Sequence, residues 1–306
     1  MSTKNKKKYS INLIFSESSL PRLETEVLLA FLLGKSREFI LAHPEESLDK
    51  IVYKKFKELE KKRLNNWPIA YLIGNKEFYG LDFKINASVL TPRPETELIV
   101  DEIITLSGSG LYKEAQIIDI GTGSGAIIVA VAEELRRRFS LVFSQSAFKA
   151  VDISTRALII AKKNAAKHKL KNKIKFYHGN LLEPLKLDIT KLGHKKENKS
   201  KLSETSLIIS ANLPYLTKRQ IKASPSISRE PKLALDGGSD GLKYYRELFG
   251  QFTKLGLNTS KFCLLCEIDQ SQRAKMTKLV KKYFPGAKLE IKKDLAGRYR
   301  LAKIFK

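Results

Sequence analysis

The sequence predicts an α/β protein whose larger part is a seven-stranded, Rossmann-like parallel sheet covered by helices on both faces. Three observations predict this fold. From Ala115 onward, short apolar segments of strand length alternate with amphipathic segments of helix length. A glycine-rich turn, Gly121–Gly125, joins the first of these strands to its helix. A later strand, Leu207–Ala211, carries mainly small and branched apolar residues, as strands buried on both faces do.

A small all-α domain is expected over residues 1–74. Residues 1–10 are expected to form a frayed basic tail. Apolar spacing predicts one helix over residues 20–33, closed by Gly34, with the pattern Leu23, Val27, Leu28, Phe31 and Leu32. A second helix is predicted over residues 48–64, with Ile51, Val52, Phe56 and Leu59 facing inward. The next segment, Lys76–Asn86, alternates with a period near two and turns at Gly80, so residues 75–90 are expected to be a β-hairpin linker.

The remaining residues, 91–306, are expected to form the sheet domain. After an extended lead-in with two prolines, Thr96 or Thr91 is expected to cap a helix over residues 97–106. Further helices are predicted over residues 126–138, 154–169 and 272–283, and strands over residues 117–120, 148–151, 174–177, 207–210, 262–268, 288–292 and 299–304. Residues 186–205 contain six lysines and no core pattern, which indicates a flexible insertion.

Composition limits the partners and the compartment. The net charge of +25, from 57 Lys and Arg against 32 Asp and Glu, is compatible with a nucleic-acid or ribosome partner, or simply with a Lys-biased surface. The longest strongly apolar segment, Ala126–Ala132, is too short to span a bilayer, and no signal-peptide core follows the basic start. Cys263 and Cys266 form C-x-x-C without a second ligand pair, so we expect buried strand thiols and no metal site. We expect a cytoplasmic protein with no membrane association.

The glycine-rich turn predicts a cofactor site. Its five residues are Gly121, Thr122, Gly123, Ser124 and Gly125. The glycines let the backbone turn sharply and let a ligand approach main-chain N–H groups. Asp152 ends the second strand 27 residues after Gly125, where a carboxylate can accept both hydroxyls of a ribose. Because the same residues satisfy the dinucleotide fingerprint, the turn by itself indicates an adenosine-containing cofactor and leaves its identity open.

The fourth strand ends in a corner, Asn212-Leu213-Pro214-Tyr215, that favours methyl transfer over hydride transfer. Asn212 Oδ1 and the Leu213 carbonyl can each accept one hydrogen bond, which suits a planar –NH₂ group of an amide or an adenine. Pro214 stiffens the turn, and Tyr215 supplies a flat apolar surface. A dehydrogenase needs a proton-relay residue instead, and we expect all four histidines to lie away from the strand ends: His43, His168, His178 and His194.

A resemblance covers almost the whole chain and narrows these alternatives. PRLETEVLLAFLLG, PIAYLIGNKEFYGLDFKIN, TPRPETE, DIGTGSGAI, AVDIS, HGNLLEPL, NLPYL, EPKLALDGGSDGLKYYREL and KDLAGRYRLAKIF follow one another in order. Together they closely resemble the PrmC/HemK family, the methyltransferases of peptide chain release factors. TPRPETE and LALDGGSDGL are specific to that family among methyltransferases.

The resemblance implies an N-terminal helical domain, which would dock the release factor, and a seven-stranded methyltransferase domain whose last strand runs antiparallel. It implies methyl transfer from S-adenosyl-L-methionine, leaving S-adenosyl-L-homocysteine, to the side-chain amide nitrogen of the glutamine in the Gly-Gly-Gln motif of class 1 release factors, without a metal. The family's cofactor loop falls on Gly121–Gly125, its ribose acid on Asp152 and its adenine segment on Asn180 and Leu181. The clamp for the substrate amide falls on Asn212–Tyr215, and Asn212 also borders the cofactor. We expect a monomer.

Two departures keep a second substrate class open. The family usually has proline where this chain has Leu213, which retains the carbonyl but adds an N–H. Asn-Leu-Pro-Tyr is also the pattern of ribosomal RNA adenine dimethyltransferases, so an adenine-N6 methyltransferase acting on RNA or DNA is the alternative. Asn180 stands where an acid is common, and it can bond to adenine only without charge. A non-enzymatic RNA-binding protein with this fold is the third hypothesis.

Overall fold

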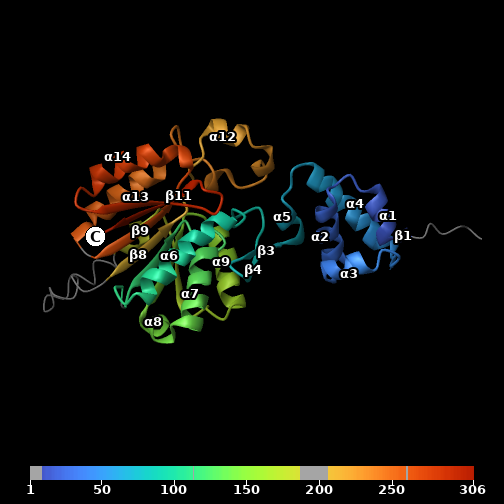
Figure 1. The fold of residues 1–306 in the computed structure, drawn as a ribbon, viewed down its shortest axis with the longest axis horizontal. Helices are drawn as coiled ribbons and strands as arrows, with labels where there is room; N and C mark the ends of the chain where they lie inside the picture. Colours follow the sequence, from blue (N-terminus) through green and yellow to red (C-terminus); the bar gives the residue numbers. More distant parts are fainter. Residues whose placement is uncertain (1–8, 113, 187–205, 260) are drawn as a thin grey trace, which may run out of the picture. The chain divides into compact units, whose positions relative to one another are not determined.

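The computed structural model describes residues 9–112, 114–186, 206–259 and 261–306 (Figure 1). The predicted insertion therefore lies outside the described residues, except for Lys186. The chain divides into two compact units. The first comprises the described residues up to Asn75 together with Ser224–Arg229, and the second comprises Lys76–Ala223 and Glu230–Lys306.

The first unit is a helical bundle with one short strand pair. Its elements are β1 (Tyr9–Ser10), α1 (Ile11–Glu17), α2 (Arg22–Leu33), α3 (Arg37–Ala42), β2 (Ser47–Leu48), α4 (Lys50–Leu64) and α5 (Ile69–Ile73). Residues 1–10 were predicted to be a frayed tail, and this was wrong for Tyr9 and Ser10, which form β1. Tyr9 pairs with Leu48, and the Ser10 hydroxyl accepts a hydrogen bond from the Leu13 N–H at 3.2 Å, which caps α1.

The two predicted helices are present, and most of each predicted apolar pattern is buried or packed against the core: Leu28 and Leu32 of α2, and Val52, Phe56 and Leu59 of α4. In α2, Leu28 and Leu29 are completely buried, whereas Leu23 and Phe31 are 55% and 48% exposed. In α4, Phe56 is buried and Ile51 is 62% exposed. The helical period is a local property, whereas the buried stripe of α2 is chosen by the helices that it packs against, α3 and α4.

The predicted hairpin is confirmed. Strands β3 (Asn75–Phe78) and β4 (Leu81–Lys84) are joined by Tyr79 and Gly80, whose φ angles are 53° and 68°. Two consecutive positive φ angles are those of a type I′ turn, whose twist matches that of the flanking strands.

The second unit is built on a seven-stranded sheet with the order β10-β11-β9-β8-β5-β6-β7. Its strands are β5 (Gln116–Ile120), β6 (Ala147–Asp152), β7 (Ile174–His178), β8 (Leu207–Ala211), β9 (Phe262–Glu267), β10 (Lys288–Lys293) and β11 (Tyr299–Phe305). The five strands from β9 to β7 are parallel, and the last strand, β11, runs antiparallel to both of its neighbours. The predicted fold class is confirmed.

Helices cover both faces of this sheet (Figure 1): α6, α7 and α9 lie on one face, and α13 and α14 on the other. The helices are α6 (Glu97–Gly108), α7 (Ala126–Arg138), α8 (Ser140–Gln145), α9 (Thr155–Lys167), α12 (Lys218–Lys222), α13 (Lys243–Lys254) and α14 (Arg273–Tyr283). Helices α8, α12 and α13 were not predicted from the sequence. A clear signal existed for α13, because Tyr245, Leu248, Phe249 and Phe252 recur at helical spacing, and all four are buried.

The sheet is covered deeply enough to bury both cysteines of β9 completely, as predicted. Burial raises the pKa of the Cys263 thiol to about 12, so it stays protonated at neutral pH. Within the described ranges, no helix combines the length and the apolar character that crossing a bilayer requires.

Candidate active site

The register of the sheet brings the ends of four strands to one level. Ile120 of β5 pairs with Val151 of β6 and with Ala211 of β8, and Ala211 pairs with Cys266 of β9. The next residues along the chain, Gly121, Asp152, Asn212 and Glu267, therefore all emerge at the same carboxyl edge. The chain leaves β5 in one direction towards β6 and returns on the other side through β8, and ligands of such sheets bind at this reversal.

A pocket lies beyond this edge, and it gathers ten of the twelve predicted site residues. They are Gly121, Thr122, Gly123, Ser124, Asp152, Asn180, Leu181, Asn212, Leu213 and Pro214. The pocket holds about 1150 Å³ of empty space including its open mouth, which is enough for a nucleoside-sized ligand beside a side chain.

The glycine loop is held in a shape that only glycine adopts readily. Gly121, Gly123 and Gly125 have φ angles of 73°, 55° and 80°. The N–H groups of Gly121 and Thr122 both donate to the Val151 carbonyl, at 2.9 and 3.0 Å, which ties the loop to the neighbouring strand. The loop therefore presents its backbone to the pocket in a fixed form.

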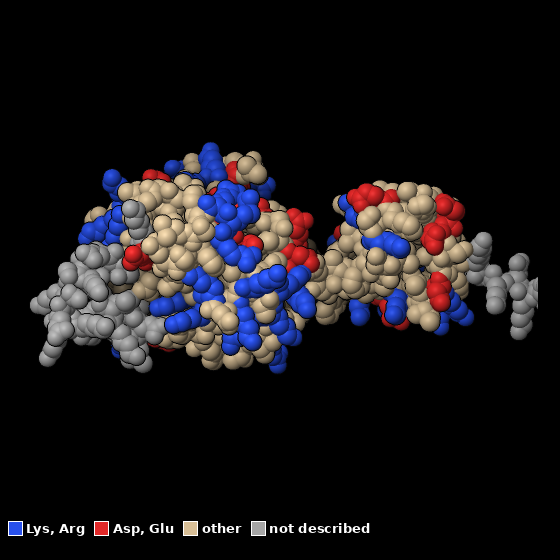
Figure 2. Space-filling model, turned by 90° about the horizontal axis from the view of Figure 1, so that it is seen from below, with Lys and Arg blue, Asp and Glu red and all other residues tan. Residues whose placement is uncertain are grey.

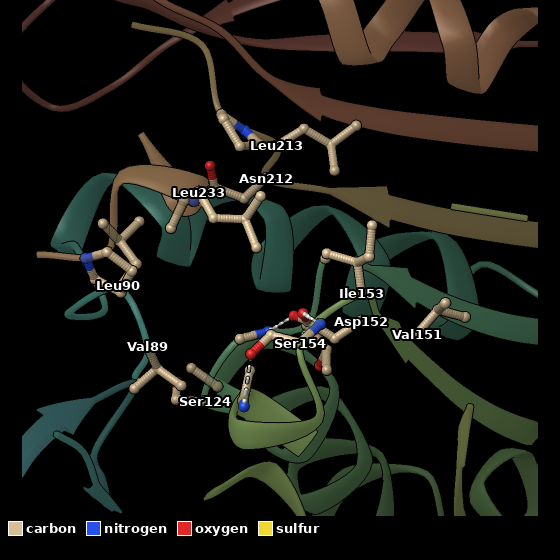
Figure 3. A pocket seen from close by; sticks show the side chains of 18 of the residues that line it. Val89, Leu90, Ser124, Val151, Asp152, Ile153, Ser154, Asn212, Leu213 and Leu233 are labelled. Carbon is tan, nitrogen blue, oxygen red and sulfur yellow. Dashed lines mark hydrogen bonds between the residues drawn. The ribbon is translucent and has the colours of Figure 1, made fainter. Parts of the chain in front are cut away.

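Asp152 braces this loop and faces the pocket. Its Oδ2 accepts the Gly123 N–H at 2.8 Å, and its Oδ1 accepts the Ser154 N–H at 2.8 Å (Figure 3). Burial raises the pKa of Asp152, and the two N–H donors oppose that rise. Each carboxylate oxygen keeps further acceptor capacity, so the group can still bind two hydroxyls.

His178 corrects one expectation about the histidines. It ends β7, where its residue pairs with Asp152, and its ring Nε2 lies 3.0 Å from the Ile153 carbonyl. The expectation that all histidines lie away from the strand ends was therefore wrong, because β7 extends one residue further than predicted. His178 does not line the pocket.

Asn212 stands across the pocket from Asp152, next to Leu213 and near Leu233 (Figure 3). Its Nδ2 donates to the Thr96 hydroxyl at 3.1 Å. Among the described residues, Asn212 Oδ1 has no hydrogen-bond partner. The amide therefore keeps an acceptor available for a ligand.

Thr96 was expected to be a possible cap of α6, and this expectation was wrong. It occupies the N-cap position, but its side chain makes no capping hydrogen bond. Its hydroxyl instead donates to Glu267 Oε2 at 2.6 Å and accepts from Asn212. Thr91, the other candidate, is buried outside the helix.

Two predicted site residues, Gly125 and Tyr215, do not line the pocket. Gly125 sits behind the loop, where its missing side chain lets α9 approach: a Cβ there would lie 3.2 Å from Ala161 Cβ. The Tyr215 hydroxyl donates to Glu267 Oε1 at 3.1 Å, behind the Asn212 corner. Both residues therefore support the pocket wall, where direct contact with a ligand was expected.

Leu213, which stands where the family usually has proline, fits the structure with both its side chain and its backbone N–H. Its side chain is buried, and Cδ2 lies 3.0 Å from the place of a Cβ on Gly121, so the loop and the corner pack directly together. Burial raises the pKa of the Tyr245 hydroxyl well above its usual value, and a backbone hydrogen bond from Leu213 opposes that rise. The additional N–H of Leu213 is thus used within the core.

The predicted adenine segment follows β7. Leu181 has a φ of 52°, unusual for a residue with a side chain, and such backbone strain is concentrated at binding sites. The Asn180 side-chain amide donates to Glu247 Oε1, and the Leu182 N–H donates to the Gln251 side chain at 2.8 Å. Helix α13 therefore holds the segment in place.

Further pocket residues were missed by the sequence analysis. They come from the segment that follows the hairpin, from the long connection after β8 and from the start of α13, and they include Val89, Leu90, Pro92, Arg93, Pro231, Leu233 and Tyr244. Arg93 and the buried Glu230 hold the two segments together, with Nη2 and Oε2 2.7 Å apart. The signal was available, since both segments contain motifs that we noted as family-specific without giving them a role.

Asn164 of α9 was also missed. Its side-chain amide donates to the Ser124 carbonyl at 2.8 Å and to the Lys84 carbonyl at 2.9 Å, and its Oδ1 accepts the Lys84 N–H. It thereby links the glycine loop to β4. Its place in the middle of an ordinary amphipathic helix gave no signal in the sequence.

Two family models match parts of the chain. Residues 12–74 match the family described as the PrmC N-terminal domain, and residues 111–216 match the family described as a methyltransferase domain. The release factor glutamine methyltransferase of Bacillus subtilis (strain 168) is 35% identical over 279 residues, covering 90% of this chain and 88% of that protein. Its counterpart from Dictyoglomus turgidum is 32% identical over 288 residues, covering 92% and 90%.

Among solved structures, the hMettl16 catalytic domain in complex with a MAT2A 3'UTR hairpin superimposes with a TM-score of 0.53 at 16% identity, covering 74% of this chain and 75% of that one. This similarity concerns the fold alone. The 35% and 32% identities to the two relatives extend over about nine-tenths of this chain, and the N-terminal domain also matches. These matches show the family as well as the fold. The chain belongs to the release factor glutamine methyltransferase family.

Proposed function

We propose that this protein transfers the methyl group of S-adenosyl-L-methionine to the side-chain amide nitrogen of the glutamine in the Gly-Gly-Gln motif of class 1 release factors. The observation that carries the proposal is the Asn212 corner: Asn212 lines the glycine-lined pocket at the carboxyl edge of the sheet, and its amide oxygen has no hydrogen-bond partner among the described residues. Family membership supports the choice of substrate.

The residues present fit an adenosine-containing methyl donor. The loop Gly121–Gly125 would hold its polar end, Asp152 the two ribose hydroxyls, and Asn180 with Leu181 the adenine. When bound, S-adenosyl-L-methionine supplies a methyl group on a sulfonium and leaves as the neutral thioether S-adenosyl-L-homocysteine. The walls of the pocket are mainly apolar, which favours a reaction in which a cationic charge is dispersed.

Asn212 and Leu213 would position the substrate nitrogen. An amide nitrogen is a weak nucleophile because its lone pair is delocalised into the carbonyl. When Asn212 Oδ1 and the Leu213 carbonyl each accept one of its N–H groups, the nitrogen has a fixed place and direction. Positioning of this kind supplies at most about 7–11 kcal/mol of a barrier. We propose no general base and no metal, because the N-protonated amide cation that methyl transfer forms is a strong acid and loses its proton to water.

Pro214 and Tyr215 complete the corner. Pro214 lines the pocket. Its ring restricts the backbone next to the Leu213 carbonyl, which is proposed to accept a hydrogen bond from the substrate amide. Tyr215 anchors the corner through its hydroxyl bond to Glu267. A planar carboxamide entering beside Pro214 would then meet a rigid wall.

The first unit is proposed to dock the release factor. On α2, Leu23 and Phe31 lie two turns apart on one face and are about half exposed, with Val27 between them. An exposed apolar stripe of this kind marks an interaction surface more often than a plain solvent face. We further propose that the enzyme acts as a monomer in the cytoplasm, which light scattering and cell fractionation can test.

The decisive experiment compares substrates. The protein is incubated with methyl-labelled cofactor and either a class 1 release factor, the same factor with its motif glutamine replaced by alanine, or ribosomal RNA. We expect label only in the unaltered release factor, and mass spectrometry should place one methyl group on the motif glutamine. Label in RNA, with a steep loss of activity as salt rises, would favour the adenine-N6 alternative.

A further inference from the structure

The Asn212 amide is connected to a buried carboxylate on the next strand. Glu267 ends β9 at the level where Asn212 follows β8, because Ala211 pairs with Cys266. The Thr96 hydroxyl lies between them: it donates to Glu267 Oε2 at 2.6 Å and accepts from Asn212 Nδ2 at 3.1 Å. The three side chains come from β9, from the residue before α6, and from the corner after β8.

The direction of these hydrogen bonds decides which end of the amide faces the pocket. A hydroxyl has one proton, and the proton of Thr96 is donated to Glu267. Thr96 can then only accept from Asn212, so the –NH₂ end of the amide must turn towards it. The oxygen end is left towards the pocket. Without this constraint the two ends of an amide have nearly the same shape and could exchange.

Glu267 can impose this direction because its oxygens accept on both sides. Tyr215 donates to Oε1, and Thr96 donates to Oε2. The side chain is almost completely buried, where a carboxylate is costly to keep unless both of its oxygens are hydrogen-bonded. Glu267 stands at the end of a chain of hydrogen bonds that leads to Asn212.

We propose that Glu267 and Thr96 are positioning residues that orient Asn212 so that Oδ1, and not Nδ2, meets the substrate –NH₂ group. This inference rests on the proposed function, since only a substrate that offers N–H groups needs an oxygen there. A glutamine at position 267 would offer an –NH₂ group to Thr96. The hydroxyl proton would then turn to Asn212 and attract its oxygen away from the pocket.

The first test is a pair of substitutions at Thr96. Thr96→Val keeps the shape and removes the hydroxyl, and we expect kcat on release factor to fall about 10- to 100-fold while the Kd for S-adenosyl-L-methionine changes less than about threefold. Thr96→Ser restores the hydroxyl and should restore kcat to within about threefold of the original. Thr105→Val on the same helix removes an exposed hydroxyl that bonds only the Asp101 carbonyl, and should leave both values unchanged.

The second test is Glu267→Gln, which keeps the volume but replaces one of the two acceptor oxygens by a donor –NH₂ group. We expect a kcat loss of at least about tenfold with cofactor affinity retained, in protein whose thermal unfolding confirms a folded state. If Glu267→Gln does not fold, the kcat values of Thr96→Val and Thr96→Ser still test the inference. A Thr96→Val variant with the original kcat would overturn the inference while the unaltered protein still methylates release factor. Failure of the unaltered protein to methylate release factor would instead overturn the proposed function.

Discussion

At the scale of single residues, the site depends on which atom of a side chain faces the pocket. Asn212 offers one acceptor that has no partner within the described ranges, and Asp152 offers acceptor capacity beyond its two bonds to backbone N–H groups. In the proposed reaction, Asn212 positions the amide that receives the methyl group, and Asp152 binds the ribose of the methyl donor. Substitutions of the two residues should therefore have different effects. Loss of Asn212 is expected to impair the reaction, and loss of Asp152 to impair cofactor binding.

The first prediction concerns Asn212→Ala. Removing Oδ1 leaves the substrate nitrogen held by one acceptor, so kcat on release factor should fall about 100-fold or more. The Kd for S-adenosyl-L-methionine, measured by calorimetry, should change only a few-fold. Asn65→Ala, at an exposed asparagine that bonds the Lys61 carbonyl, is the matched control and should retain full activity. Near-normal methylation by Asn212→Ala would contradict the assignment of the clamp.

At the scale of elements, glycines decide how closely helices approach the loop. Gly125 begins α7 with a positive φ, and the place of its missing Cβ is filled by α9. Gly34 ends α2 with a similar φ of 62°, but a Cβ there would meet nothing within 4 Å. Alanine substitutions at Gly34 and Gly125 therefore separate two losses of stability: the strain of a positive φ, and the contact of a new Cβ with a neighbouring helix.

The second prediction follows from this pair. Alanine at either position has the unfavourable left-handed conformation, worth about 1–2 kcal/mol. Only Gly125→Ala also forces α7 and α9 apart, which costs about 1–3 kcal/mol more. Urea unfolding should therefore show the larger loss of stability for Gly125→Ala than for Gly34→Ala, accompanied by weaker cofactor binding. Equal losses would show that the contact between Gly125 and Ala161 is unimportant.

The third prediction concerns the exposed stripe of α2. Replacing Leu23 and Phe31 together by serine should raise KM for release factor about fivefold or more, because apolar surface buried on docking is lost. Activity on a short Gly-Gly-Gln peptide should not change, since the pocket is intact. Leu141→Ser, at a 68% exposed leucine of α8, provides the control for lost apolar surface. An unchanged KM would remove α2 from the docking surface.

At the scale of the whole molecule, charge has two different consequences. Figure 2 shows many Lys and Arg side chains on one face of the second unit, with uncharged surface between them. Such a surface is compatible with contact to a polyanion, which the salt dependence of activity tests. Inside the molecule, by contrast, a buried acid lowers stability. Asp119 of β5 is almost completely buried, and this raises its pKa to about 6 although the Thr122 and Ser210 hydroxyls donate to it.

The fourth prediction is the pH dependence of this effect. A carboxyl whose pKa rises from 3.8 to about 6 on folding favours the folded state below pH 3.8 and progressively loses that contribution as pH rises through about 6. A shift of about two units corresponds to roughly 3 kcal/mol. Asp119→Asn should therefore gain stability relative to the original protein between about pH 4 and pH 7, as measured by chemical unfolding at each pH. A stability difference independent of pH would contradict the shift.

The sequence by itself determined the seven strands of the second unit and the helices α6, α7, α9 and α14, the glycine loop, and the acid and the corner that follow the next strands. Each of these features depends on a local sequence signal: the spacing of apolar residues, the glycines of a turn, or a polar residue at the end of a strand. Such signals extend over only a few residues. Residues 187–205 lie outside the described ranges, and the boundaries of the domains remain predictions. The sequence could not determine that Leu23 and Phe31 of α2 and Ile51 of α4 are exposed, because a helical period does not show where the buried stripe ends.

Only the tertiary structure decided that Thr96 bonds Glu267 across 171 residues of sequence rather than capping its own helix. It also decided that Tyr215 and Gly125 stand behind the pocket wall, and that α13 and Asn164 hold the loops. The physical reason is the same in each case. A hydroxyl or an amide bonds to whatever partner the register of the sheet brings within about 3 Å, and that register is set by packing over the whole domain.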